Sequence, residues 1–390
     1  MNINRPFNFL SATDVRFGLG AVAGVGQACR DLGVKRVLVV SDPYIVSSGT
    51  IKKVTDVLDA EAVDYAVYSD FEPSPPVSKV LSASNFMHEN DFQGIIGFGG
   101  GSSLDTAKAV GVLHSNPLPV EQYFGIEKIP NPICPTIMIP TTAGTGSEVS
   151  NACILRNDAT NVKSGICSRF IMANIAICDP ELTVTCPPAL TASVGMDAYA
   201  HCIEGFVSNN ANTLTRTFHR EAISLIAHNL CNAVYNGNDI EARYNMMLGA
   251  VYAGWAMAVA SLGACHAMAY AIEGKYHASH GDANAALLPA VMRYNALGNL
   301  ELFKKMAQLM GEPVDGLNDR DAAFAAVDSV QQLVSDIGIK NVKKLGMTEE
   351  DVEEFAQSTM SCQTRLLSFN PRKLTLEACA GIYRDAMAQD

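Results

Sequence analysis

The segment GIIGFGGGSSLDTAK, residues 94–108, predicts both a fold and a site. Its apolar start is typical of a strand buried on both faces, and three consecutive glycines and helix-forming residues follow. Glycine lets a phosphate oxygen approach the backbone, and a helix N-terminus offers unpaired N–H groups with partial positive charge. The segment therefore predicts a strand, loop and helix that bind a pyrophosphate. The alternative is an ordinary helix capped by Ser102 and Asp105, which leaves the glycines unexplained.

Three more apolar runs precede or follow this segment: RVLVVSD (36–42), YAVYSDF (65–71) and TIMIPTT (136–142). They alternate with helix-length stretches, which is the pattern of a parallel sheet with helices on both faces. Beyond about residue 180, helix formers dominate, and 390 residues are enough for two hydrophobic cores. We therefore predict an α/β dinucleotide-binding domain over residues 1–180 and an all-α domain over residues 181–390.

A second polar loop, PTTAGTGSE (140–148), follows the strand candidate TIMIP and carries several hydroxyl groups. Polar loops at the carboxyl ends of neighbouring strands are where open sheets of this kind bind ligands. Asp42 ends another strand candidate, where a carboxylate would bind ribose hydroxyls and repel a 2′-phosphate. This favours NAD over NADP, although Asp42 before Pro43 is also typical of a simple turn.

The segment GLGAVA (18–23) also has the spacing of a dinucleotide motif, GxGxxA. That motif requires a preceding buried strand, and ATDVRF before it is a poor candidate for one. We therefore predict a turn and the start of a helix here, without a cofactor.

Acidic and imidazole side chains recur at helical spacing in the C-terminal half. Asp197 and His201 are four residues apart, His266 and Tyr270 repeat that spacing, and His280 lies on a loop or at a helix start. One carboxylate with three imidazoles suits Fe(II) or Zn(II) and suits Ca or Mg poorly. Taken alone, a histidine on an apolar helix is more often a hydrogen-bonded core residue than a metal ligand.

Composition limits the partners and the location. A net charge of −12 and a pI near 5.1 disfavour nucleic acid and anionic membrane surfaces. Residues 244–272 lack charged side chains, but their Ala and Gly content favours a buried core helix over a membrane span. Eleven scattered cysteines, and a start without the pattern of a secretory signal, favour the cytoplasm.

Several of these motifs together resemble the iron-containing, or group III, alcohol dehydrogenases. They are GFGGGSSLDTAK (97–108), TTAGTGSE (141–148), DPELT (179–183), GMDAYAHCIE (195–204) and HAMAYAIEGKYHASHGDANAALLP (266–289). The resemblance implies NAD(H) and Fe(II), or Zn(II) as the alternative, in a cleft between the two domains. It also implies hydride transfer between a small primary alcohol and its aldehyde, the substrate oxygen lying on the metal, and a homodimer or higher homo-oligomer.

The resemblance assigns roles residue by residue. The implied metal ligands are Asp197, His201, His266 and His280. The implied cofactor contacts are Asp42, Ser74, Gly100, Gly101, Ser102, Asp105, Thr141, Thr142, Thr145, Lys163 and Leu182, with Ser74 where the family usually has Asn.

Two positions depart from the family pattern near the expected substrate. Tyr270 stands where the family commonly has a second histidine, and His277 is also not the usual residue. We predict that Tyr270 orients a polar or anionic substrate group, and the alternative is that it only fills space. Proton release is then left to water, cofactor ribose hydroxyls or His277.

Two other functions remain open at this point. A lyase of the dehydroquinate-synthase type uses a related two-domain architecture with NAD and a metal, and steady NADH turnover would separate the two activities. A non-catalytic metal- and nucleotide-binding protein would leave both polar loops without a catalytic purpose.

Overall fold

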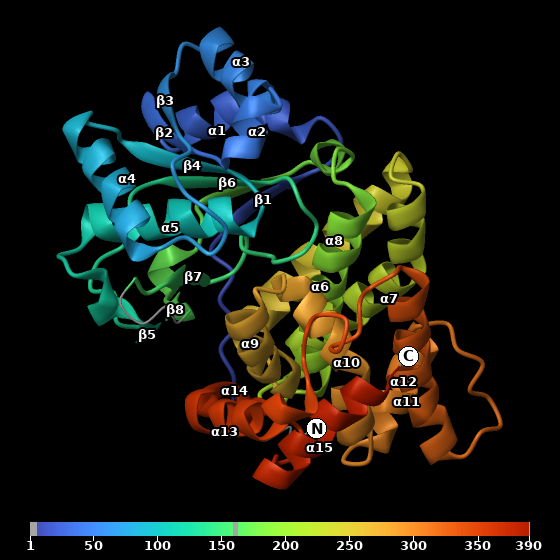
Figure 1. The fold of residues 1–390 in the computed structure, drawn as a ribbon. Coiled ribbons are helices and arrows are strands. Elements are labelled where there is room, and N and C mark those ends of the chain that lie inside the picture. Colours follow the sequence, from blue (N-terminus) through green and yellow to red (C-terminus); the bar gives the residue numbers. More distant parts are fainter. Residues whose placement is uncertain (1–5, 159–162, 390) are drawn as a thin grey trace. The chain divides into compact units, whose positions relative to one another are not determined.

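The computed structural model describes residues 6–158 and 163–389, and within them the chain divides into two compact units. One unit is Leu10–Val184. The other begins at Thr185 and also includes the described residues before Leu10. Figure 1 shows the first as a layered α/β structure and the second as a group of helices.

The α/β unit is built on a six-stranded sheet in which every neighbouring pair is parallel. The four strands predicted from the apolar runs are confirmed within it. Across the sheet, the strands are β1 (Asp14–Phe17), β9 (Ile175–Cys178), β6 (Thr136–Pro140), β4 (Gly94–Gly99), β2 (Arg36–Val40) and β3 (Asp64–Tyr68).

Both faces of this sheet are covered, as the unbroken apolar runs predict. Along β2, Leu38 and Val40 face one core cluster, whereas Val37 and Val39 face the other. The first cluster includes side chains of α4 (Val77–Glu89) and α5 (Gly101–Ser115). The second includes side chains of α1 (Val25–Asp31), α2 (Pro43–Ser47) and α3 (Lys52–Ala60).

A small second sheet completes this unit, in the order β5 (Gly125–Ile126), β8 (Lys163–Cys167) and β7 (Ala152–Arg156). Short 3-10 turns connect the larger elements. They are η1 (Ala21–Gly24), η2 (Val120–Tyr123), η3 (Arg169–Ile171) and η4 (Pro180–Thr183).

ATDVRF contains a strand that was not predicted, but it is not the buried strand that the dinucleotide motif requires. Asp14–Phe17 is β1, which pairs with β9 at the edge of the sheet and is only partly buried, so it does not need a continuous apolar run. The turn and helix predicted after it are confirmed by η1 and α1. The amides of Gly20 and Val22 donate to the buried carboxylate of Asp179 at 3.2 and 3.1 Å, so an internal anion already binds this loop.

The second unit has no strand among its described residues, as predicted. Its long helices α6, α7, α8 and α10 pack against one another, and α6 is buried along most of its length. The helices are α6 (Pro188–Val207), α7 (Thr213–Tyr235), α8 (Ile240–Ala260), α9 (Ala264–Tyr276), α10 (His280–Ala296), α11 (Leu300–Leu309), α12 (Asp319–Asp336), α13 (Val352–Cys362), α14 (Thr364–Phe369) and α15 (Leu376–Ala388), with the 3-10 turn η5 (Glu349–Asp351).

The uncharged stretch 244–272 forms two helices rather than the predicted single one. The break between α8 and α9 contains Ser261, whose φ is 60°, and the two helices meet at 102°. Within the described chain, no single helix is long and apolar enough to cross a membrane. The bent pair would pass that test by length and composition only.

Candidate metal centre and glycine-rich loops

Three helices supply the residues of the candidate metal centre. Asp197 and His201 lie four residues apart on α6, so they share a face of that helix. His266 lies in the first turn of α9, and His280 is the first residue of α10. The N-cap of α10, Ser279, accepts a hydrogen bond from the Asp282 amide at 3.2 Å, which fixes that helix start.

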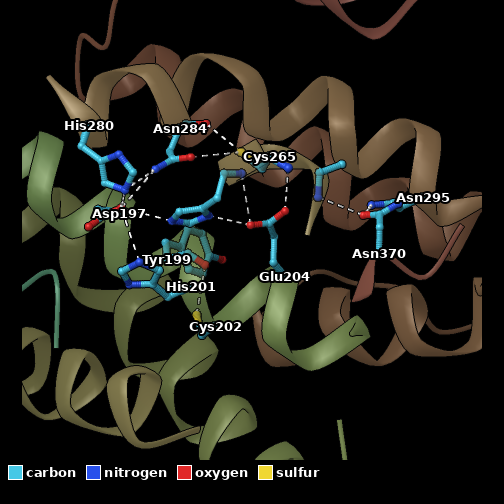
Figure 2. Close-up of polar contacts among 12 residues, drawn as sticks. Asp197, Tyr199, His201, Cys202, Glu204, Cys265, His280, Asn284, Asn295 and Asn370 are labelled. Carbon is cyan, nitrogen blue, oxygen red and sulfur yellow. Dashed lines mark hydrogen bonds and ion pairs between the residues drawn. The ribbon is translucent and has the colours of Figure 1, made fainter. Parts of the chain in front are cut away.

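The side chains of these four residues converge on one point. The Nε2 atoms of His201, His266 and His280 each lie 3.6 Å from Oδ1 of Asp197. One potential ligand atom from each residue lies within 4.8 Å of all the others, and Figure 2 shows Asp197, His201 and His280 pointing toward one another. Bonds of about 2.0–2.2 Å to one ion would bring ligand atoms to comparable separations.

The centre is electrostatically prepared for a cation. Burial acts to raise the pKa of Asp197, but the histidines, His201 first, hold that pKa well below its usual range. Burial lowers the pKa of His201 to about 4, although Asp197 acts in the opposite direction. Burial also opposes charge on His266, but the carboxylates of Asp197 and Glu204 raise its pKa to about 9. Asp197 therefore supplies a negative charge among the three imidazoles.

Carboxylates behind two of the imidazoles orient them. Glu204 Oε2 lies 2.6 Å from His266 Nδ1, and Glu273 Oε1 lies 2.5 Å from His280 Nδ1. A hydrogen bond from Nδ1 leaves the Nε2 lone pair directed at the centre, which is the usual arrangement behind metal-bound histidine. Asn284 Nδ2 also donates to Asp197 Oδ1 at 3.2 Å.

These two supporting glutamates were not predicted from the sequence, although their spacing is informative. Glu204 lies seven residues after the candidate ligand Asp197, and Glu273 lies seven residues after the candidate ligand His266. Each glutamate therefore shares a helix face with that residue. Both are acids in otherwise apolar helix segments, where an unpaired carboxylate would be costly.

The four residues fit a bound divalent ion. Among the described residues, Nε2 of His266 is buried and has no hydrogen-bond partner. A buried nitrogen without a partner is costly, unless a bound ion interacts with it. Three imidazole nitrogens and one carboxylate oxygen match the preference of Fe(II) or Zn(II).

Of the two residues that depart from the family pattern, Tyr270 lies beside this centre. Its ring stacks on that of His280, with centroids 5.9 Å apart and planes 29° apart. His277 is exposed and is the C-cap residue of α9, with a left-handed φ of 53°.

In the α/β unit, the segment 94–108 forms the predicted strand, loop and helix. The N-cap of α5 is Gly100, and no side chain caps this helix. The alternative capping pair of Ser102 and Asp105 does not form. Asp105 instead accepts hydrogen bonds from Ser147 Oγ at 2.7 Å and from the Ile154 amide at 3.0 Å.

The two polar loops lie side by side, because β4 and β6 are neighbours and the Thr141 amide donates to the Gly99 carbonyl at 2.9 Å. A Cβ atom on Gly101 would lie 2.6 Å from Thr145 Cγ2, so loop packing requires that glycine. A Cβ atom on Gly100 would lie no closer than 3.6 Å to Thr142, an ordinary contact, and φ of Gly100 is −76°. Neither packing nor backbone conformation requires glycine at position 100.

The Asp42 carboxylate has contacts both in its own turn and at the glycine-rich loop. Its Oδ1 accepts from the Ile45 amide at 3.0 Å and caps α2, while its Oδ2 lies 3.4 Å from the hydroxyl of Ser103 on α5. The carboxylate therefore lies at the glycine-rich loop as well as in a turn.

The remaining implied cofactor residues are placed as follows. The amide of Ser74 donates to Ser102 Oγ at 3.4 Å, which brings Ser74 to the start of α5. Lys163 begins β8 of the small sheet, and Leu182 is 3% exposed within the core cluster that also contains α1.

A fully buried lysine beneath these loops was not predicted. Lys108 of α5 donates to the carbonyls of Ser150 and Ala152 at 2.8 and 3.0 Å, and so ties the helix to the loop after β6. In the sequence, the position of Lys108 among the apolar residues of DTAKAVGVL indicates that this lysine is buried.

Comparisons with known proteins agree with this geometry. Residues 12–180 match the family model "Iron-containing alcohol dehydrogenase", and residues 191–387 match "Fe-containing alcohol dehydrogenase family, C-terminal". The chain is 38% identical to the 1,3-propanediol dehydrogenase of Klebsiella pneumoniae, over 98% of this chain and 99% of that one. It is 33% identical to the NAD-dependent methanol dehydrogenase of Bacillus methanolicus, over 97% of this chain and 100% of that one.

A crystal structure of a 1,3-propanediol oxidoreductase superposes with a TM-score of 0.95 at 37% identity, covering 98% of this chain and 100% of that one. The resemblance inferred from the motifs is thus confirmed along nearly the whole chain. The chain belongs to the iron-containing alcohol dehydrogenase family and is an oxidoreductase of that family.

Proposed function

We propose that this oxidoreductase interconverts a small primary alcohol and its aldehyde, using NAD(H) and one divalent ion, Fe(II) or alternatively Zn(II). The ion would be held by Asp197, His201, His266 and His280. The observation that carries the proposal is the convergence of these four side chains, at 3.6 Å from each histidine Nε2 to Asp197 Oδ1.

When bound, the ion would supply a Lewis acid for the substrate oxygen, and the nicotinamide would supply or accept the hydride. The protein's own groups would hold the ion and orient the imidazoles around it. Glu204 and Glu273 accept from Nδ1 of His266 and His280, which keeps the Nε2 lone pairs of those imidazoles on the centre. Low exposure of Asp197 and His266, 3% and 1%, limits water at that point.

The glycine-rich loops support the dinucleotide part of the proposal. The start of α5 lacks a side-chain cap, so its amides can bind phosphate oxygens, and Gly100 leaves the approach open. The carboxylate of Asp42 would bind the ribose hydroxyls and so select NAD. The remaining contacts proposed are Ser74, Gly101, Ser102, Asp105, Thr141, Thr142, Thr145, Lys163 and Leu182, and a relative of this chain is named an NAD-dependent enzyme.

Two further roles concern the substrate. Tyr270, stacked on His280, would orient a polar or anionic group of the substrate, and His277 would be one route for the proton. The proposal also includes a homodimer or higher homo-oligomer and a cytoplasmic location.

The test is NADH oxidation with a panel of small aldehydes, including diol-derived, sulfonated and phosphonated ones. We expect steady turnover that is lost on chelation and restored by Fe(II) or Zn(II). Full activity without metal would contradict the metal role, and the absence of NADH binding would contradict the dinucleotide role. Consumption of a non-redox substrate without net NADH turnover would instead favour a lyase.

A further inference from the structure

The N-terminus of α9 carries His266 in its first turn and receives its caps from distant segments. The first amides of a helix have no partner inside it, and the N-cap residue Gly263 has no side chain to offer one. The Ala264 amide donates to Asn370 Oδ1 at 3.2 Å, and the Cys265 amide donates to Glu204 Oε1 at 2.6 Å. A residue after α14 and a residue of α6 therefore cap α9, as Figure 2 shows for Asn370, Cys265 and Glu204.

Glu204 also contacts both the main chain and the side chain of His266. Its Oε2 accepts from the His266 amide at 3.4 Å and from the imidazole Nδ1 at 2.6 Å. One carboxylate thus faces three N–H groups, two from the helix start and one from the metal-ligand ring. Backbone position and ring orientation of His266 depend on the same two oxygen atoms.

Gly263 fits this arrangement. A Cβ atom there would lie 2.9 Å from Asn370 Oδ1 and 3.1 Å from Glu204 Oε1, so the two caps converge where only glycine leaves room. Glu204 is 4% exposed and Asn370 is 2% exposed, so water would not readily replace either cap.

Glu273, the other carboxylate that contacts a proposed ligand, differs from Glu204 in its surroundings. Glu273 bonds to His280 from α9, and the His280 side chain is 33% exposed, compared with 1% for His266. Glu204 instead lies on α6 together with Asp197 and His201. Helix α6 thereby carries two ligands and the support of a third.

We propose that Glu204 is a positioning residue of the metal centre, which fixes His266 and the start of α9 in one geometry. The proposal rests on the metal dependence proposed above. Glutamine at this position would keep the shape but offer one acceptor oxygen and an NH2 group that faces donors. At least one of the three N–H groups would lose its partner, so either the start of α9 or the ring of His266 would lose its fixed position.

The first experiment compares metal affinity in Glu204→Gln, wild type and a matched control. The control is Asn212→Ala, which removes the cap of α7 in the same unit, since Asn212 Oδ1 accepts from Leu214 and Thr215 rather than supporting a ligand. Zn(II) affinity is measured by competition with a chromophoric chelator. We expect Glu204→Gln to bind about 10- to 100-fold more weakly and Asn212→Ala to bind like wild type. Unchanged affinity in folded Glu204→Gln would overturn the proposal.

The second experiment needs no metal. Amide hydrogen exchange in the peptide covering residues 263–268 should be faster in metal-free Glu204→Gln than in metal-free wild type, and unchanged in Asn212→Ala. Unchanged exchange in Glu204→Gln would again overturn the positioning role. If wild type bound no divalent ion, the proposed function would fail, whereas faster exchange in the variant would still support the role of Glu204 at α9.

Discussion

The candidate metal centre of the helical unit and the glycine-rich loops of the α/β unit are built in different ways. The candidate centre consists of side chains from three helices. Its proposed ligands are separated by as many as 83 residues, Asp197 to His280, and are supported by buried acids. The loops consist mainly of backbone and small side chains that directly follow two neighbouring strands, β4 and β6. We therefore expect substitutions in the candidate centre to act by removing charges and ligand atoms, and substitutions in the loops to act by adding side-chain volume.

The largest effect is expected from removing one ligand of the centre. His266→Ala should lose the bound ion and lower turnover by about a thousandfold or more, since a Lewis acid supplies several kcal/mol and 1.36 kcal/mol is tenfold. Metal content by mass spectrometry and NADH oxidation measure the two losses.

A matched histidine substitution tests whether this effect is specific. His228 is exposed on α7 and its Nδ1 lies 2.7 Å from the Ser224 carbonyl, so His228→Ala should retain both metal and turnover. Equal metal content in wild type and His266→Ala would contradict the role of the centre, provided that circular dichroism shows both to be folded.

In the loops, two neighbouring glycines should respond differently to alanine. Gly101→Ala places Cβ against Thr145 and should lower the free energy of unfolding by about 1–3 kcal/mol. Gly100→Ala should leave stability nearly unchanged but raise KM for NADH roughly 10- to 100-fold, because charge-assisted hydrogen bonds contribute about 1.5–3 kcal/mol. Thermal unfolding and initial rates distinguish the two. A normal KM in Gly100→Ala would remove the phosphate role from this position.

The same contrast explains how much could be predicted from sequence. Three of the four predicted strands, β2, β4 and β6, are largely buried and are continuous apolar runs, as in RVLVV of β2. The fourth, β3, lies at the sheet edge and is partly buried, and the short buried strand β9 was not predicted. Edge strand β1, with only partial burial, lacks such a run and was missed. The i, i+4 spacing on α6 predicted that Asp197 and His201 share a helix face, and the consecutive glycines predicted the strand, loop and helix of residues 94–108.

The supporting groups were harder to predict because they act across the fold. Glu204 reaches a ring 62 residues away, and Asn370 reaches an amide 106 residues away. Local sequence records only that a polar residue lies in an apolar helix, as for Glu204 and Lys108. What it bonds to depends on which helices pack together, so these partners became identifiable only in the structure.

A smaller effect is expected at Asp42, where the charge of the side chain can be removed with little change in its size. Asp42→Asn keeps an N-cap acceptor for Ile45 but removes the charge. It should raise the ratio of kcat/KM for NADPH to that for NADH about tenfold, since a 2′-phosphate would no longer face a carboxylate. Steady-state kinetics with both cofactors measure the ratio. A wild type that already prefers NADPH would contradict selection by Asp42.

The smallest expected effect is at Tyr270, which lies beside the candidate metal centre but is not one of its proposed ligands. Its ring stacks on His280 at 5.9 Å, so the phenol can contribute either its hydroxyl to the substrate or only its surface to the imidazole. Tyr270→Phe keeps the surface and removes the hydroxyl. Loss of one substrate hydrogen bond should lower kcat/KM about five- to tenfold, roughly 1 kcal/mol, with metal affinity unchanged. If Tyr270→Phe matches wild type on the best substrate while Tyr270→Ala is impaired, the ring packs against His280 and does not orient the substrate.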